Sequence, residues 1–323
     1  MIAFVWGMSS LEAIKASAAR GGVKQALALG VALGVFACQT VPSEPSRESP
    51  VVGAAARFAQ AAARVTGQEA KLADEYENGR HVGFDTYKYP GTKVMKIWKD
   101  TPGSPYKWVG FYLPAPCHSG RTWVGKRAEI DSMGWGVAVV YVGQQTWGRN
   151  PRRLTAAQRE ALRKKDACSA DLLSADEGRR DADDAVAVSK AEGFEKGLVV
   201  FLDIERMETI PQAMREYYRA WTARMLELGE YRPGVYAHRH NAAEIFADVQ
   251  AVFKEKGVNE TPRFWIAGGK GFHEGRAPQD AGFAFTGVWQ GLLDVARSVA
   301  EVRLPIDVNV AKWESPSETG VTQ

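Results

Sequence analysis

The chain has 323 residues, of which 45% are hydrophobic and 24% charged, so its composition is that of an ordinary globular protein. Its 41 Lys and Arg residues against 38 Asp and Glu residues leave a formal net charge of +3, which gives no electrostatic case for nucleic-acid binding. A chain of this length can hold one α/β barrel of about 250 residues or two smaller domains.

An uncharged apolar stretch lies near the start of the chain, at residues 25–37, and follows Arg20 and Lys24. It is too short to span a bilayer as a helix but suits the apolar core of a secretory signal, so we expect residues 1–38 to direct export. The stretch ends in VFAC, which resembles a bacterial lipoprotein cleavage site and implies lipidation of Cys38 and a membrane anchor. Ordinary signal-peptidase cleavage and a chance apolar helix are the alternatives.

The next segments connect this leader to the folded part. Residues 39–53 are rich in Pro, Ser and Glu, so we expect a disordered linker that cannot bury enough apolar surface to order itself. Residues 54–80 alternate small and charged residues without Pro, which indicates a helical segment. The barrel domain is expected over residues 81–315, and residues 316–323 are expected to form a tail.

Short apolar runs alternate with helical patterns from residue 81 onward. Most runs are continuous, which is typical of parallel strands covered on both faces. The helical patterns include residues 181–192 and 211–228. We therefore predict an α/β protein with a closed TIM-type (β/α)8 barrel in which irregular elements are allowed; a doubly wound open sheet is the alternative. The predicted strands are 81–85, 108–113, 136–142, 198–204, 234–237, 264–267, 287–290 and 306–310.

One insertion is much longer than the usual connection. Residues 144–180 separate the third strand from its helix, and loops of this length are commonly functional or disordered. The insertion carries Cys168, whereas Cys117 would lie in the loop after the second strand. Two such loops share one rim of a barrel, which favours a Cys117–Cys168 disulfide in an exported domain; two separate thiols are the alternative.

Four carboxylates fall at or near the ends of three predicted strands: Asp85, Asp203, Glu205 and Asp307. Asp203 and Glu205 are two apart and so face the same side of their strand. The first and eighth strands become neighbours when a barrel closes, which would bring Asp85 and Asp307 together. Crowded carboxylates raise at least one pKa and supply an acid at neutral pH, as needed to protonate a glycosidic oxygen. The alternative is that each acid pairs with its own Arg or Lys, or caps a helix.

Aromatic and amide side chains near the same strand ends are candidates for binding a sugar. Flat rings beside amides suit the apolar faces and hydroxyls of a pyranose, although any one of them could belong to the core. His238 and His240 have no evident third ligand, so we predict no metal and no cofactor. The substrate-binding candidates are Tyr141, Gln145, Tyr236, Trp265, Trp289 and Gln290.

The series GFD, VGFYL, GWGVAVVYVGQQ, VVFLDIE, RPGVYAH, FWIAGG, VWQG and PIDVN resembles the glycoside-hydrolase-like domain that is related to family 25 lysozymes. The resemblance runs from about residue 81 to 313. It implies a TIM-type barrel, and the related lysozymes cut the β-1,4 bond between N-acetylated sugars of peptidoglycan. By position it implies that Glu205 is the acid, that Asp203 assists it, and that Asp85 and Asp307 are supporting carboxylates.

The sequence therefore favours an exported, lipid-anchored glycosidase of the bacterial cell envelope that acts on N-acetylated glycan. Asp203 would orient the acetamido group of the substrate as internal nucleophile, and a covalent or inverting route stays open because it depends on carboxylate separation. A barrel that binds envelope glycan without cutting it is the rival, since a fold does not determine a function. A different polysaccharide substrate is a third possibility.

Overall fold

The computed structural model describes residues 80–165 and 168–319. The predictions for residues 1–38, 39–53 and 54–79, including lipidation of Cys38, concern residues outside this part of the chain.

Eight strands form one closed barrel in chain order, as predicted. Each predicted apolar run corresponds to a strand, because continuous apolar residues can be covered on both faces only inside such a layered fold. The strands are β1 (His81–Asp85), β2 (Trp108–Tyr112), β3 (Gly136–Val142), β4 (Val199–Ile204), β5 (Arg232–His238), β6 (Phe264–Ala267), β7 (Thr286–Val299) and β8 (Val302–Ala311).

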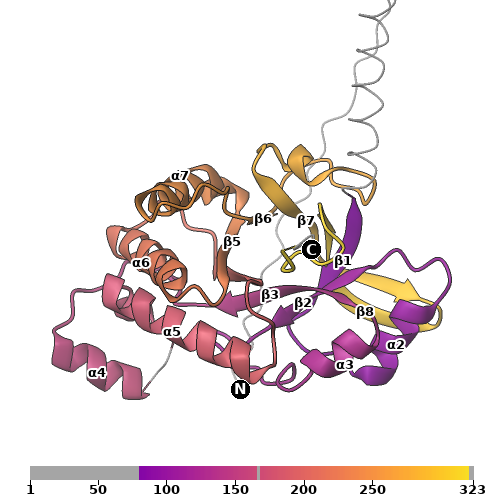
Figure 1. Ribbon diagram of the computed structural model, residues 1–323, viewed down its shortest axis with the longest axis horizontal. Coiled ribbons are helices and arrows are strands. Elements are labelled where there is room, and N and C mark those ends of the chain that lie inside the picture. The colour runs from indigo at the N-terminus through magenta and orange to yellow at the C-terminus, as the bar shows by residue number, and fades with distance from the viewer. Residues whose placement is uncertain (1–79, 166–167, 320–323) are drawn as a thin grey trace, which may run out of the picture. The chain divides into compact units, whose positions relative to one another are not determined.

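Helices cover the outside of the barrel. In Figure 1, α5, α6 and α7 lie along one flank, and α2 and α3 lie on another. The start of α5 is capped by Ser174, whose hydroxyl accepts the N–H of Glu177, and α6 ends at Gly229 in the left-handed region (φ 65°), where glycine is unstrained. The helices are α2 (Thr92–Asp100), α3 (Arg127–Ser132), α4 (Ala156–Lys165), α5 (Ala175–Ala191), α6 (Gln212–Leu228) and α7 (Arg239–Glu255), with short 3-10 turns η1 (Ala170–Leu172) and η2 (Pro278–Ala281).

The last strand departs from a regular (β/α)8 barrel. β8 pairs antiparallel with both β7 and β1, and β7 and β8 are joined directly without a helix. This pair is one of the irregular elements that the predicted barrel allowed. An antiparallel hairpin needs no helix, since only a parallel connection requires a crossover of about a dozen residues or more. The outer half of the β7–β8 hairpin packs on α2, where Trp98 Nε1 donates to the carbonyl of Val302 (3.3 Å).

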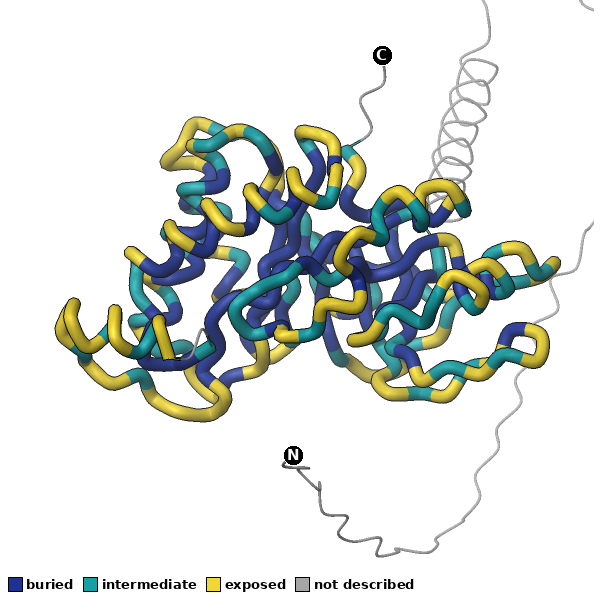
Figure 2. The backbone as a smooth tube through the Cα atoms, turned by 90° about the horizontal axis from the view of Figure 1, so that it is seen from below, coloured by how far each residue is buried: buried dark blue, intermediate teal, exposed yellow. Residues whose placement is uncertain are grey.

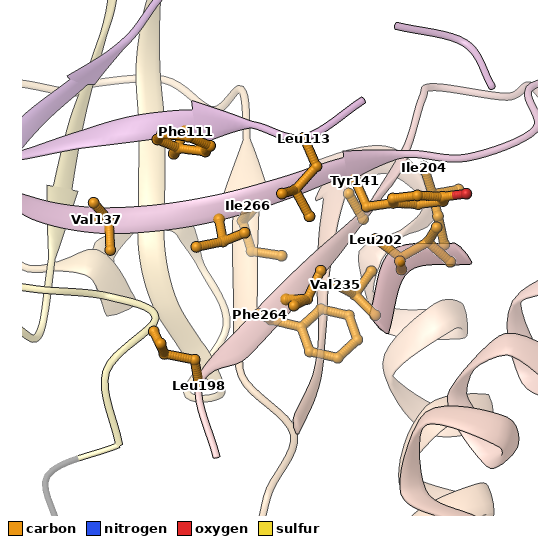
Figure 3. Close-up of a cluster of buried hydrophobic side chains, with 14 of the residues drawn as sticks. Phe111, Leu113, Val137, Tyr141, Leu198, Leu202, Ile204, Val235, Phe264 and Ile266 are labelled. Atoms are coloured by element: carbon orange, nitrogen blue, oxygen red, sulfur yellow. The ribbon is translucent and has the colours of Figure 1, made fainter. Parts of the chain in front are cut away.

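Two apolar clusters lie on the two faces of the sheet. The inner cluster fills the barrel and includes Trp108, Phe201 and Trp265, with the Trp108 and Trp265 rings edge to face at 5.5 Å. The outer cluster lies between the strands and the helices; Figure 3 shows part of it, including Val235 and Phe264. Figure 2 shows the result, with buried strands at the centre and exposed residues along the outer helices.

The fold continues past the predicted boundary at residue 315. Ser317 is fully buried, its hydroxyl accepts the N–H of Val139 (2.7 Å), and its carbonyl accepts the N–H of Val199 (2.7 Å). The segment thus satisfies backbone groups in the middle of β3 and at the beginning of β4. Within the part of the chain that the structure describes, no helix has the length and apolar character needed to cross a membrane.

Candidate active site

The end of β4 carries two carboxylates into the mouth of the barrel. Strand alternation points Phe201 and Asp203 to the inside, and Glu205 follows directly after the strand. Asp203 is 8% exposed, whereas Glu205 is exposed to solvent. The buried amide of Gln145 holds this segment, because its Nε2 donates to the carbonyl of Asp203 (2.8 Å) and its Oε1 accepts the N–H of Glu205 (3.1 Å).

The other two carboxylates face each other across β1 and β8. Asp85 and Asp307 are direct partners in the antiparallel register. The Nε2 of Gln290 bridges them, at 2.9 Å from Asp85 Oδ1 and 3.0 Å from Asp307 Oδ2. The Nδ2 of Asn309 also donates to Asp85 Oδ1 (2.8 Å), and the backbone N–H of Asp294 donates to Asp307 Oδ1 (2.7 Å).

Two tyrosines extend the hydrogen-bond network around Asp85 and Asp307. The hydroxyl of Tyr112 donates to Asp85 Oδ2 (2.7 Å), and that of Tyr236 donates to Gln290 Oε1 (2.6 Å). Burial and then the combined negative charge of all four carboxylates raise the pKa of Tyr236 well above its usual value. Tyr236 is also the register partner of Asp203 on the neighbouring strand, so the four acids lie at one end of the barrel.

None of the four acids forms a salt bridge within residues 80–165 and 168–319, so individual neutralisation by Arg or Lys does not account for them there. Burial raises the pKa of Asp203 well above 3.8, and Glu205 and Asp85 raise it further. Burial and the charge of Asp85 raise the pKa of Asp307 to about 7. Glu205 as a whole residue reaches solvent, but the protein atoms around its carboxyl group withdraw that group partly from water and raise its pKa. Burial also raises the pKa of Asp85 despite its hydrogen bonds from Asn309, Tyr112 and Gln290. The mouth can therefore hold protons near neutral pH.

The predicted sugar-binding residues divide into two groups. Tyr236 and Gln290 belong to the network around the acids. Trp265 lies beneath it, 1% exposed, and its Nε1 donates to Asn309 Oδ1 (2.9 Å). Gln145 lies behind Asp203 and Glu205 and positions their backbone.

Tyr141 and Trp289 lie on the outer face of the barrel, away from the acids, which corrects their expected position. The Tyr141 hydroxyl donates to Asp184 Oδ2 of α5 (2.9 Å), and Trp289 Nε1 donates to the carbonyl of Gly268 (2.8 Å). Both side chains are fully buried in the outer cluster, so they contribute to packing between strands and helices.

Two residues of the site were not among the sequence candidates. Tyr112 and Asn309 both touch Asp85; Tyr112 is the last residue of β2, whereas Asn309 lies within β8. A usable signal existed for Asn309: it stands two residues after Asp307 in PIDVN and so faces the same side of β8.

The predicted disulfide is present. Cys117, in the loop after β2, is bonded to Cys168, and their Cα atoms are 4.8 Å apart. The indole Nε1 of Trp147 donates to Cys168 Sγ (3.3 Å), so the loop after β3 joins the same contact. The insertion is thus tied to the rim beside the acids, and it contains α4 in place of the long loop that the sequence predicted.

His238, the last residue of β5, and His240, in the first turn of α7, have structural roles. Nδ1 of His238 accepts the backbone N–H of His240 (3.1 Å) at the start of α7, and the ring of His240 contacts the carbonyl of Glu208 (3.0 Å). Among the described residues, no group of three or more His, Cys, Asp or Glu side chains could hold a metal ion.

A closed α/β barrel with four acids gathered at its mouth is the architecture of a glycoside hydrolase-like domain. The chain belongs to the family of Rv2525c-like, glycoside hydrolase-like domains, whose sequence model matches residues 98–309. The family resemblance inferred from the sequence is thereby confirmed.

Several solved structures are similar to this chain. An uncharacterized protein of B. stearothermophilus is 20% identical, with 71% of this chain and 95% of that chain covered and a TM-score of 0.44. The spore cortex lytic enzyme SleM of Clostridium perfringens is 12% identical, with 72% and 67% covered and a TM-score of 0.47. The Tat-secreted protein Rv2525c of Mycobacterium tuberculosis is 14% identical, with 71% and 94% covered and a TM-score of 0.42. A comparison with curated protein sequences found no match.

Proposed function

We propose that this protein is an exported glycosidase of the bacterial cell envelope that hydrolyses N-acetylated glycan such as peptidoglycan. Glu205 acts as the general acid and Asp203 assists it. The observation that carries the proposal is the convergence of four carboxylates at one mouth with no basic partner among the described residues. Bringing several carboxylates together without a basic partner costs folding free energy. Such clusters are therefore found mainly at functional sites.

Glu205 is suited to the role of acid because it combines solvent exposure with a raised pKa. Its carboxyl group can reach a glycosidic oxygen, and it stays protonated at higher pH than an ordinary glutamic acid does. Because Asp203 and Glu205 repel each other when both are ionised, the pair holds one proton over the interval between its two titrations. The proton passes from Glu205 to the glycosidic oxygen, and the leaving sugar departs as an alcohol.

Asp203 is suited to hold the acetamido group of the substrate. Its Oδ1 atom is buried and has no hydrogen-bond partner among the residues that the structure describes, so its need for a donor is unmet there, and the acetamido N–H of the substrate supplies one. The acetamido oxygen then attacks the anomeric carbon, and water subsequently opens the resulting ring, which is the substrate-assisted form of glycoside hydrolysis. Asp85 and Asp307, fixed by Gln290, support the negative potential at the mouth.

The cellular site is part of the proposal. The apolar stretch at residues 25–37 directs export and Cys38 carries a lipid that anchors the protein to a membrane, leaving the barrel free to meet its polysaccharide. The Cys117–Cys168 disulfide supports an oxidising compartment outside the cytosol. Labelling cells with a fatty-acid probe tests the anchor: the wild type should carry the label and Cys38→Ser should not.

Hydrolysis is tested by incubating the purified protein with peptidoglycan and measuring new reducing ends. Glu205→Gln should lower the rate by about 100-fold to 10,000-fold, the usual contribution of a general acid. Glu208→Gln is the matched control, because Glu208 is exposed and paired with Arg206 outside the group of acids. Full activity of Glu205→Gln removes the proposed acid.

A glycan-binding barrel without hydrolysis is the second candidate. It is favoured by the hydrogen bonds of Asp85 and Asp307, since every oxygen of these two carboxylates already accepts a protein donor. Such a preordered network can orient the hydroxyls of a ligand without a chemical step. Saturable binding of muropeptides by the wild type, with no reducing ends released, decides for this candidate.

A further inference from the structure

Two exposed aromatic side chains stand on the rim that carries the acids. Tyr87 is 49% exposed and Trp147 is 56% exposed, and they are the aromatic members of the exposed large hydrophobic side chains in the described part. Tyr87 follows β1 and Trp147 follows β3, so both extend from the same ends of the parallel strands as Asp85 and Asp203.

Tyr87 is connected to the acids by a series of ring contacts, of which the first is tilted by 54° and the second is stacked. Its ring lies 4.4 Å from that of His118, and the His118 ring is stacked on Tyr112 at 5.0 Å with 21° between the planes. Tyr112 in turn donates its hydroxyl to Asp85. His118 is only 2% exposed, so these contacts lead from the exposed ring of Tyr87 through the buried ring of His118 to Tyr112 and Asp85.

Trp147 is held in a fixed and unusual position. Its backbone lies in the left-handed region (φ 48°), which is costly for a bulky residue and is found mainly where function requires it. Its indole N–H is taken by Sγ of Cys168, and the disulfide links that sulfur to Cys117, the neighbour of His118. Trp147 and Tyr87 are thus linked along the rim by a hydrogen bond to Cys168, the disulfide to Cys117, and the ring contact between His118 and Tyr87.

We infer that Tyr87 and Trp147 form an aromatic platform that binds sugar rings of the same glycan outside the cleavage position, so the substrate is a polysaccharide chain longer than the mouth. This inference rests on the proposed function. Exposed flat rings with polar edges match the apolar faces and hydroxyls of pyranoses. Because His118 and the disulfide already order both rings, binding loses little side-chain freedom. The occupant is a glycan because the contacts of Tyr87 continue through His118 and Tyr112 to Asp85, which belongs to the proposed cleavage site for the same polysaccharide.

The test measures binding to insoluble peptidoglycan by sedimentation in a Glu205→Gln background, where cleavage does not interfere. Tyr87→Ala and Trp147→Ala should each weaken binding at least about fivefold, as expected for truncating an aromatic anchor. Tyr87→Phe, which keeps the ring, should bind almost as the parent does. Val124→Ala is the matched control: Val124 is 36% exposed and lies in the turn before α3.

The same substitutions in the active protein separate the platform from the chemistry. On polymeric peptidoglycan Tyr87→Ala and Trp147→Ala should raise KM and leave kcat unchanged, whereas Tyr87→Phe and Val124→Ala should change neither. On a short chromogenic glycoside none of the four substitutions should change KM or kcat. Thermal unfolding verifies that each variant is folded. Wild-type hydrolysis together with polymer binding by both alanine variants within about twofold of the parent overturns the platform alone. Polymer binding that depends on both rings, without any hydrolysis by the wild type, supports the platform and overturns the proposed hydrolase. A wild type that does not bind the polymer overturns both.

Discussion

Asp181 is a buried acid outside the candidate active site, so its substitution tests what the protein interior alone does to a carboxyl group. It lies in α5, is 5% exposed, and accepts a hydrogen bond from the hydroxyl of Tyr217. Burial, aided by the charges of Glu177 and Asp184, raises its pKa from 3.8 to about 8. Asn has nearly the same shape, can still accept from Tyr217, and does not ionise.

The sign of the effect follows from proton binding. Below pH 3.8 both the folded and unfolded states are protonated at Asp181, so the group costs nothing; between 3.8 and about 8 only the folded state keeps the proton. Stability is therefore lost as the pH rises, by at most about 6 kcal/mol once the pH exceeds the folded pKa. Asp181→Asn removes this loss, so its stability relative to the wild type should increase by up to about 4 kcal/mol between about pH 5 and pH 8.

Urea unfolding of both proteins across this pH range measures the difference, and the other titrating groups cancel because they are shared. Asp183→Asn is the matched control, since Asp183 lies on the same helix, is half exposed and is paired with Arg224. It should show no pH-dependent gain. A difference between Asp181→Asn and the wild type that stays constant within about 0.5 kcal/mol across the range refutes the reasoning.

Three other outcomes are expected. Asn309→Ala should lower the free energy of unfolding by about 3 kcal/mol, because it leaves Trp265 Nε1 without its buried acceptor and removes one of the hydrogen bonds to Asp85; a loss below about 1 kcal/mol in urea contradicts this. Replacing Cys117 and Cys168 by Ser should cost about 4 kcal/mol, as expected for a crosslink spanning 51 residues, and an unchanged denaturation midpoint contradicts it. Because Glu205 must be protonated and burial raises its pKa above 4.5, kcat/KM on peptidoglycan should fall as the pH rises through that raised pKa; a rate that increases steadily from about pH 5 to pH 8 contradicts the assignment.

Much of the barrel could be predicted because continuous apolar runs have few alternatives once both faces must be covered. The runs of β1, β3 and β6 match the strands residue for residue. β7 and β8 are longer than predicted because their outer halves alternate polar and apolar residues and cover α2 with one face only. α5 begins earlier than predicted because Ser174 followed by Glu177 caps it, a local signal that the apolar pattern does not contain.

The acids of the site could be predicted, but the directions of the rings could not. An acid side chain that points into a barrel can reach solvent only at the mouth. The positions of Asp203 and Glu205 at a strand end therefore predict that both side chains point to the mouth. Tyr141 and Trp289 lie in strands that are apolar on both faces, where nothing in the sequence determines which alternate residues point inward. The structure shows that Tyr141 shares the outer face of β3 with Val137 and Val139.

The reversed direction of β8 is what allows Asp307 to join the other acids. In a regular barrel with β8 parallel to β1, an acid near the start of β8 would lie at the end opposite to Glu205. Because β8 runs antiparallel, Asp307 is placed directly opposite Asp85 at the mouth. The same reversal makes β7 and β8 one hairpin, so Gln290 and Asp307 come from paired strands and their hydrogen bond is local to that hairpin. The site thus depends on β8, the strand whose direction departs from the (β/α)8 pattern. A hairpin replaces the helical crossover between β7 and β8, and this hairpin positions both the Asp307 carboxylate and the Gln290 amide that orients it.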